Sequence, residues 1–164
     1  MNETIVLAVI SVVIFFLAPI ILKSNAIYMF LLLAVSELTS NIVSKEATKF
    51  LSSFIPSTTI PLYSVVQIAI LLMAPIFILF VYRKSMKPKY IILNIICAVS
   101  ATIVFFNLVI SKLPYENKTV IENANLFNTL GSFLDVALVA GLLASIVYIF
   151  LNKPRHDKAD KKHK

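Results

Sequence analysis

Two acidic residues, Glu37 and Asp135, stand inside long apolar segments of the chain. A charged side chain near the centre of a bilayer costs about 2.5–3.5 kcal/mol on insertion scales, so such residues usually face the protein interior or a water-filled cavity. There a carboxylate can bind a proton or a cation. One interpretation of the two acids is therefore a proton or cation site inside a membrane protein.

Further polar residues accompany the two acids at helical spacing, because residues three, four or seven apart share one helix face. The polar candidates are Glu37 with Asn41, Ser100 with Asn107, and Ser132 with Asp135. In one interpretation the three faces converge on a hydrated cleft that opens outward. In the others the same groups hydrogen-bond across helices, or the acids reach the water at the headgroups. The apolar runs contain no Lys or Arg, so we expect neither acid to have a basic partner.

Small residues mark a second face of the last apolar segment. Ala137, Gly141 and Ser145 recur every four residues, and small side chains at that spacing let two helix backbones approach closely. We expect this face to pack within the chain, with a dimer contact as the alternative.

The residue types argue against catalysis. Both histidines, His156 and His163, lie in the last nine residues, and no neighbouring base is present to activate Cys97. With only two glycines, the chain has no Gly-rich phosphate loop. We therefore expect no enzymatic activity, no metal ion and no cofactor.

Composition defines the elements that must position these residues. Hydrophobic residues make up 59% of the 164 residues and charged residues 14%, against about 45–50% and about 25% in soluble domains. These values exclude a water-soluble globule and a disordered chain. Because lipid offers no partner for free backbone groups, the sequence predicts an all-α polytopic membrane helix bundle.

Five segments are long and apolar enough to cross a membrane, since a span needs about 20 residues to cover about 30 Å of hydrocarbon. The expected spans cover residues 4–22, 26–43, 61–82, 89–111 and 126–151. The uninterrupted apolar run of the second span covers only 26–35, so four spans plus a re-entrant segment is the alternative.

Two shorter segments lie outside these spans. Residues 44–55 have an apolar and a polar face, which predicts either a short amphipathic helix at the interface or an outward extension of the second span. Residues 1–152 then form a single transmembrane domain, and the charged residues 153–164 form a disordered basic tail.

Orientation follows from the distribution of basic residues. With five spans, the side that holds Lys23, the 83–89 loop and the tail carries 11 Lys and Arg, and the other side carries four. The sequence therefore predicts a multi-pass protein of the cell membrane with its N-terminus outside and its C-terminus in the cytoplasm.

The tail is expected to meet lipid headgroups. Basic residues directly after a span attract anionic headgroups by about 1 kcal/mol each near the surface. The expected contacts are Lys153, Arg155, Lys158, Lys161 and Lys162. No aromatic residue is interleaved among them to stack on bases, so we expect no nucleic-acid binding.

Residues 4–112 contain a hairpin of two spans, a third span that ends in basic residues, and a further span. This hydropathy layout resembles the colicin V production protein family. The residues Leu22-Lys23-Ser24-Asn25 stand where that family's Gly- and Arg-containing motif would be, so the resemblance covers hydropathy only.

Three functions stay open at this level. The leading one is a small non-enzymatic accessory or assembly subunit that acts through helix packing. The others are a small transporter or channel with a site at Glu37 and Asp135, and a distant relative of the colicin V production group. The expected partners are the lipid bilayer, anionic lipids at the tail, and another membrane protein or a second copy of the chain.

Single cysteines at positions 2 and 160, in a Cys97→Ala background, test the five-span topology. An odd number of crossings places the two positions on opposite sides. An impermeant thiol reagent added outside should therefore label position 2 and should reach position 160 only after the membrane is opened. Labelling of both positions from the same face would contradict five spans.

Overall fold

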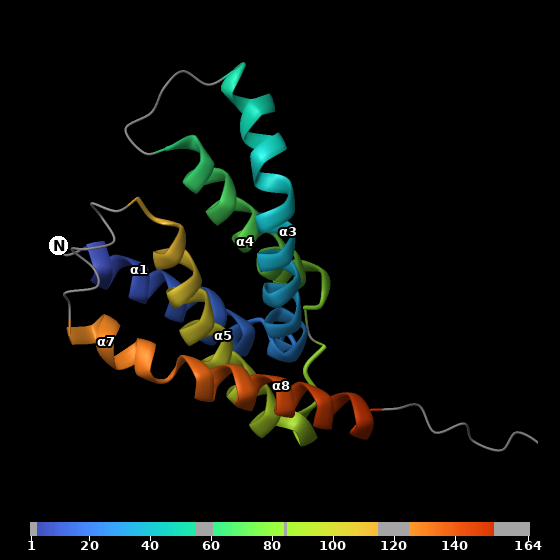
Figure 1. Cartoon of the computed structure of the whole chain (residues 1–164). Helices are drawn as coiled ribbons and strands as arrows, with labels where there is room; N and C mark the ends of the chain where they lie inside the picture. Colours follow the sequence, from blue (N-terminus) through green and yellow to red (C-terminus); the bar gives the residue numbers. More distant parts are fainter. Residues whose placement is uncertain (1–2, 55–60, 84, 115–124, 153–164) are drawn as a thin grey trace, which may run out of the picture.

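The computed structural model describes residues 3–54, 61–83, 85–114 and 125–152. In these ranges the chain forms helices and no strand, and the fold is an all-α helix bundle (Figure 1). Four helices are long and apolar enough to cross a membrane, and a shorter apolar helix covers Val9–Ile21. The predicted fold class is confirmed. The tail, residues 153–164, lies outside the described residues.

The first helical segment contains a π-helical turn just before a proline. It consists of α1 (Glu3–Val12), a π-helical turn (Val13–Leu17) and α2 (Ala18–Ile21). Pro19 has no N–H, and its ring crowds the carbonyl four residues earlier, which a wider turn relieves. The Ala18 N–H accordingly bonds the Val13 carbonyl, five residues back.

Helix α3 (Ala26–Ser52) is a single helix of 27 residues. At 1.5 Å per residue it is about 40 Å long, which exceeds the hydrocarbon thickness of about 30 Å. Residues 44–52 continue it without a break, so of the two interpretations of 44–55 the structure has the extension of the second span. The length also disfavours the re-entrant alternative. Ser36, Ser40 and Ser44, which interrupt the apolar run, are buried.

The remaining elements follow the predicted spans with one exception. They are α4 (Leu62–Val81), the 3₁₀ turn η2 (Pro88–Tyr90), α5 (Ile91–Lys112), α7 (Asn125–Ser132) and α8 (Leu134–Leu151). The expected helix over 126–151 is broken at Phe133, whose φ and ψ are −94° and 1°. The break follows Gly131, a residue that weakens a helix.

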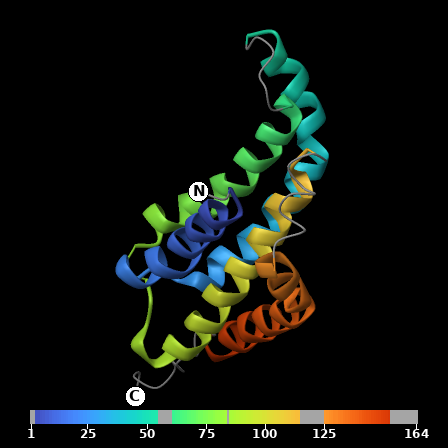
Figure 2. The ribbon, with the colours of Figure 1, turned by 90° about the vertical axis from the view of Figure 1, so that its left-hand side faces the viewer.

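Helix α5 lies at the centre of the bundle and contacts helices on every side (Figure 1). α1 and the π-helical turn pack along one side of it, where the rings of Phe15 in that turn and Phe105 lie 4.5 Å apart. α8 packs along another side. α3 and α4 form an antiparallel pair whose connected ends extend beyond the other helices (Figure 2). α1 and α3 diverge from the tight turn that joins them, so they do not pack as a hairpin along their length.

The turn before α3 ends one helix and starts the next. Lys23 adopts a left-handed φ of 51°. The Ser24 N–H bonds the Pro19 carbonyl (2.9 Å) and the Lys23 N–H bonds the Ile20 carbonyl (3.2 Å), the bonding pattern of a Schellman motif. Asn25 then caps α3 by accepting the Ile27 N–H at 3.0 Å.

Three buried side chains tie this turn to α5 and α8. The Asn94 side chain of α5 accepts the Ala26 N–H at 2.6 Å. Asn25 donates to the Tyr148 hydroxyl of α8 at 2.8 Å. All three side chains are less than 4% exposed. We call Asn25, Asn94 and Tyr148 the asparagine clasp.

The loop between α4 and α5 joins the same end of the bundle. The Met86 N–H bonds the Lys23 carbonyl at 2.9 Å, and Lys87 donates to the Asn152 side chain at 2.7 Å. This end therefore gathers several exposed basic residues, and we call it the basic end. Its members are Lys23, Arg83, Lys87 and Lys89.

The small residues of α8 lie inside the chain. Ala137, Gly141 and Ser145 are all buried. A Cβ atom added to Gly141 would lie 2.5 Å from Cζ of the Phe30 ring. Ser145 donates to the Gly141 carbonyl at 2.7 Å. Glycine is required here because α3 and α8 approach through the Phe30 ring.

The substitution Gly141→Ala should lower the free energy of unfolding by about 1–3 kcal/mol, because the added methyl overpacks a ring that is only 2% exposed. Gly131→Ala is the matched control. A Cβ there meets only Asn107 Oδ1, at 3.8 Å, so it should be neutral or stabilise by up to about 1 kcal/mol. Thermal unfolding in detergent, followed by circular dichroism, measures both. Equal effects would contradict the close approach at Gly141.

Candidate functional site

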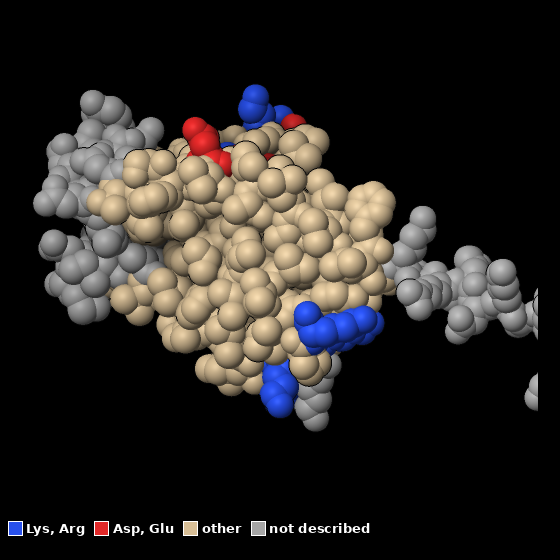
Figure 3. All heavy atoms as spheres, turned by 90° about the horizontal axis from the view of Figure 1, so that it is seen from below, with Lys and Arg blue, Asp and Glu red and all other residues tan. Residues whose placement is uncertain are grey.

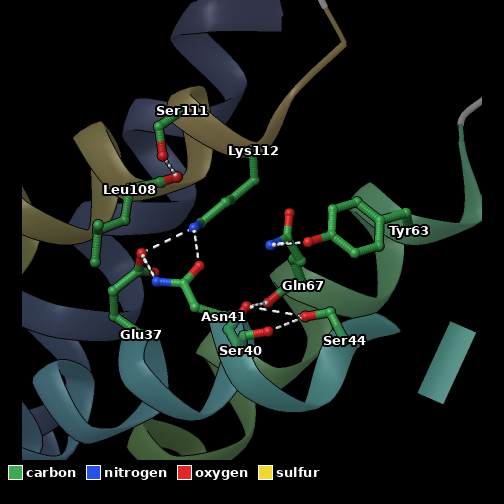
Figure 4. A network of polar contacts seen from close by, with 9 residues as sticks. All are labelled: Glu37, Ser40, Asn41, Ser44, Tyr63, Gln67, Leu108, Ser111 and Lys112. Carbon is green, nitrogen blue, oxygen red and sulfur yellow. Dashed lines mark hydrogen bonds and ion pairs between the residues drawn. The ribbon is translucent and has the colours of Figure 1, made fainter. Parts of the chain in front are cut away.

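Glu37, Asn41 and Lys112 form a polar cluster between α3 and α5 (Figure 4). The Lys112 ammonium donates to Glu37 Oε1 at 2.8 Å and to Asn41 Oδ1 at 2.8 Å. Asn41 donates in turn to the same Glu37 oxygen at 3.0 Å. We call this triangle the Glu37–Lys112 cluster. It is electrically neutral, since one carboxylate faces one ammonium.

The positions in the helices explain the cluster. Glu37 and Asn41 lie one turn apart and therefore share a face of α3. Lys112 is the last residue of α5, and its long side chain reaches back along apolar surface while carrying the charge at its tip. The Glu37 and Lys112 side chains are 23% and 12% exposed, so water screens the ion pair only in part.

The expectation that neither acid has a basic partner is wrong for Glu37. Lys112 lies just beyond the predicted span 89–111, which places it outside the membrane when each helix is considered alone. In the structure α3 and α5 cross, so the middle of α3 meets the end of α5. The pairing depends on that crossing and not on the local sequence.

Asp135 does not join the cluster. It lies in the first turn of α8 with an exposed side chain, and among the described residues the contacts of Glu37 come from Asn41 and Lys112. Ser132 is also exposed and donates to the Thr129 carbonyl at 2.7 Å. The described residues therefore do not place both acids in one shared cleft.

The two candidates on α5 lie apart from each other. Ser100 is buried. Asn107 donates to the Ile103 carbonyl, one turn back, at 2.8 Å, and its Oδ1 faces Gly131 of α7. Neither side chain has a hydrogen bond to Glu37, so the predicted polar face of α5 does not extend the cluster.

A second polar network borders the cluster, and its connection to α4 was not predicted from the sequence (Figure 4). Ser44 donates to the Ser40 carbonyl, and Ser40 lies 3.4 Å from the Gln67 carbonyl of α4. Gln67 donates to the Tyr63 hydroxyl at 3.2 Å. The sequence feature that could have predicted this contact is the four-residue spacing of Ser36, Ser40 and Ser44, which is typical of closely packed helices.

One oxygen atom of the cluster, Glu37 Oε2, has no hydrogen-bond partner among the described residues and can accept one. This oxygen is buried. A carboxylate oxygen of this kind can accept a proton, a water or a cation. No group of three or more His, Cys, Asp or Glu gathers within the described ranges, so the described part of the chain offers no protein cage for a transition metal.

The chain is an all-α helix bundle with an ion pair between two of its helices, and its apolar helices are compatible with a multi-pass membrane protein. Comparison with protein-family models, curated proteins and solved structures gives no match to this chain. The similarity to the colicin V production family thus stays at the level of hydropathy layout.

The two partners of the ion pair should be energetically coupled. Lys112→Met leaves the Glu37 carboxylate without its counter-charge and should destabilise the protein more than Lys112→Met combined with Glu37→Gln. A double-mutant cycle should give a coupling free energy of about 0.5–3 kcal/mol, measured by thermal or denaturant unfolding in detergent.

The exposed pair Lys49–Glu46 is the control, since its side chains are 75% and 76% exposed. Its coupling should not exceed about 0.5 kcal/mol, because water screens a surface pair. A coupling at Glu37–Lys112 as small as at Lys49–Glu46 would show that the cluster contributes nothing to stability.

Proposed function

We propose that the protein is a small non-enzymatic accessory or assembly subunit that acts through helix packing in the membrane. The observation that carries this proposal is how the intramembrane polar groups are bonded. The carboxylate of Glu37 is neutralised by Lys112 of the same chain, and Asn25, Asn94 and Tyr148 bond one another or the backbone. Groups engaged in this way stabilise a scaffold, and in the Glu37 carboxylate only Oε2 stays without a partner among the described residues.

The outer surface supports the same proposal. Among the described residues, one face of the molecule is almost entirely uncharged, with acidic and basic atoms near its margin (Figure 3). Along α8, Val136, Leu143 and Phe150 recur every seven residues and are 64%, 57% and 72% exposed. Such a ridge suits contact with lipid or with another transmembrane helix.

The orientation belongs to this proposal. The basic end gathers the turn before α3, the loop after α4 and the end of α8. By the positive-inside rule this end faces the cytoplasm, which puts the N-terminus outside and the tail inside.

A proton or cation pathway is the second candidate, and the unpartnered oxygen Glu37 Oε2 is the observation that favours it. An ionisable residue inside a membrane protein is a functional candidate by default. In this candidate Lys112 and Asn41 hold the carboxylate in place while Oε2 receives the ion.

Photocrosslinking tests the leading proposal. A photoreactive amino acid at Val136 or Leu143 should give one discrete protein adduct in native membranes, because these positions face outward. The same residue at Ser145, which is 1% exposed, should give adducts only within the chain. Mass spectrometry of the adduct then identifies a second copy or another membrane protein. Lipid adducts alone at both exposed positions would contradict a packing role for α8.

Flux in proteoliposomes separates the second candidate. Under the accessory proposal, proton and monovalent-cation flux through the wild type should equal that of protein-free liposomes. A flux that Glu37→Gln abolishes, in a variant with an unchanged unfolding midpoint, would overturn the accessory proposal in favour of transport. Asp135→Asn is the matched control, since Asp135 lies outside the cluster.

A further inference from the structure

An apolar groove runs between α3 and α4 on the outer surface of the bundle. Its volume is about 540 Å³, and nearly all of its lining is apolar. The walls are formed by Leu32, Val35 and Thr39 of α3 and by Ile70, Met73 and Phe77 of α4. Both helices are candidate membrane spans, so the groove opens into the hydrocarbon region.

The groove leads toward the basic end. On α3, Leu32 lies one turn above Tyr28, whose ring is 5.4 Å from the ring of Tyr82 at the end of α4. Tyrosines commonly mark the membrane–water interface. Lys23 precedes α3 and Arg83 follows Tyr82 in the chain, and both residues are exposed. The apolar groove is thus followed, toward the basic end, by two aromatic rings and then by positively charged residues.

The groove lies within reach of a lipid chain whose headgroup is at the basic end. Along α4, Arg83 is six residues from Phe77 and 13 from Ile70, which is about 9 Å and about 20 Å at 1.5 Å per residue. Half of a hydrocarbon core of about 30 Å is about 15 Å. With its headgroup at Arg83, a lipid chain would lie at the level of the groove.

The volume favours a lipid chain over a helix. Sites for small ligands are about 300–1,000 Å³. A transmembrane helix about 10 Å wide and 30 Å long occupies about 2,400 Å³, several times the space available.

We propose that the groove binds one acyl chain of an anionic phospholipid, whose headgroup phosphate binds Arg83 and Lys23. The apolar walls hold the chain, the Tyr28–Tyr82 pair lies at the glycerol level, and the two cations select a negative headgroup over a neutral one. The site differs from the expected tail contact because its specificity comes from a groove and two folded residues.

A photoreactive lipid tests the site directly. The probe is phosphatidylglycerol with a diazirine midway along one chain, incorporated into nanodiscs that contain the full-length protein. Crosslinks should concentrate in residues 32–39 and 70–77, relative to the exposed ridge of α8. Phosphatidylcholine has the same phosphate, but its choline ammonium offsets the negative charge. With the same diazirine it should therefore label the groove at least about fivefold less. Equal labelling of the groove and the α8 ridge by both lipids would overturn the proposal.

Two pairs of variants separate the chain from the headgroup. Val35→Phe fills the groove, since Val35 lines it and is 53% exposed, whereas Leu38→Phe adds the same ring at a 65% exposed position outside it. Only Val35→Phe should abolish groove labelling. Arg83→Gln should lower the preference for phosphatidylglycerol about fivefold, and Lys45→Gln at the other end should leave it unchanged. An unaltered preference in Arg83→Gln, with the unfolding midpoint preserved, would contradict the headgroup assignment.

Discussion

The first turn of α3 sets the constraint on which the rest of the bundle depends. A helix that starts at the membrane interface leaves its first N–H groups without intrahelical partners, and each must find an acceptor. Asn25 accepts one of these groups and Asn94 accepts another. Because Asn94 belongs to α5 and Asn25 also bonds Tyr148 of α8, the cap of one helix fixes three helices in register. The aromatic contact between Tyr90 and Tyr148, whose rings lie 5.0 Å apart, closes the same joint.

Along α3, starting from that joint, three different kinds of contact hold the helix to its neighbours. Close to the clasp, Gly141 lets the Phe30 ring lie against the backbone of α8. Further along α3, the helix crosses α5, and Glu37 there meets the end of α5 at Lys112. Beyond the crossing α4 is the described helix that accompanies α3, through buried serines. Packing, ion pairing and small-residue contact thus follow one another along a single 27-residue helix.

Hydropathy and charge were sufficient to predict the helix bundle and the approximate ranges of its spans, because the bilayer imposes both length and polarity. The four-residue spacing also identified Glu37 and Asn41 as neighbours. Lys112 was missed because its contact with Glu37 depends on how two helices cross. Asn94 was missed because one amide within an apolar run resembles a tolerated polar residue until Ala26 is placed beside it. The break at Phe133 depends on a local helix end that hydropathy does not report.

The clasp also carries a consequence for the order of events during synthesis. Asn25 and Tyr148 are separated by 123 residues, which a ribosome adds in about 6–25 s at 5–20 residues per second. During the first part of that interval neither Asn94 nor Tyr148 has been synthesised. Tyr148 is added only at the end of the interval. The joint at the start of α3 is therefore completed only when α8, the last helix of the described residues, has been made.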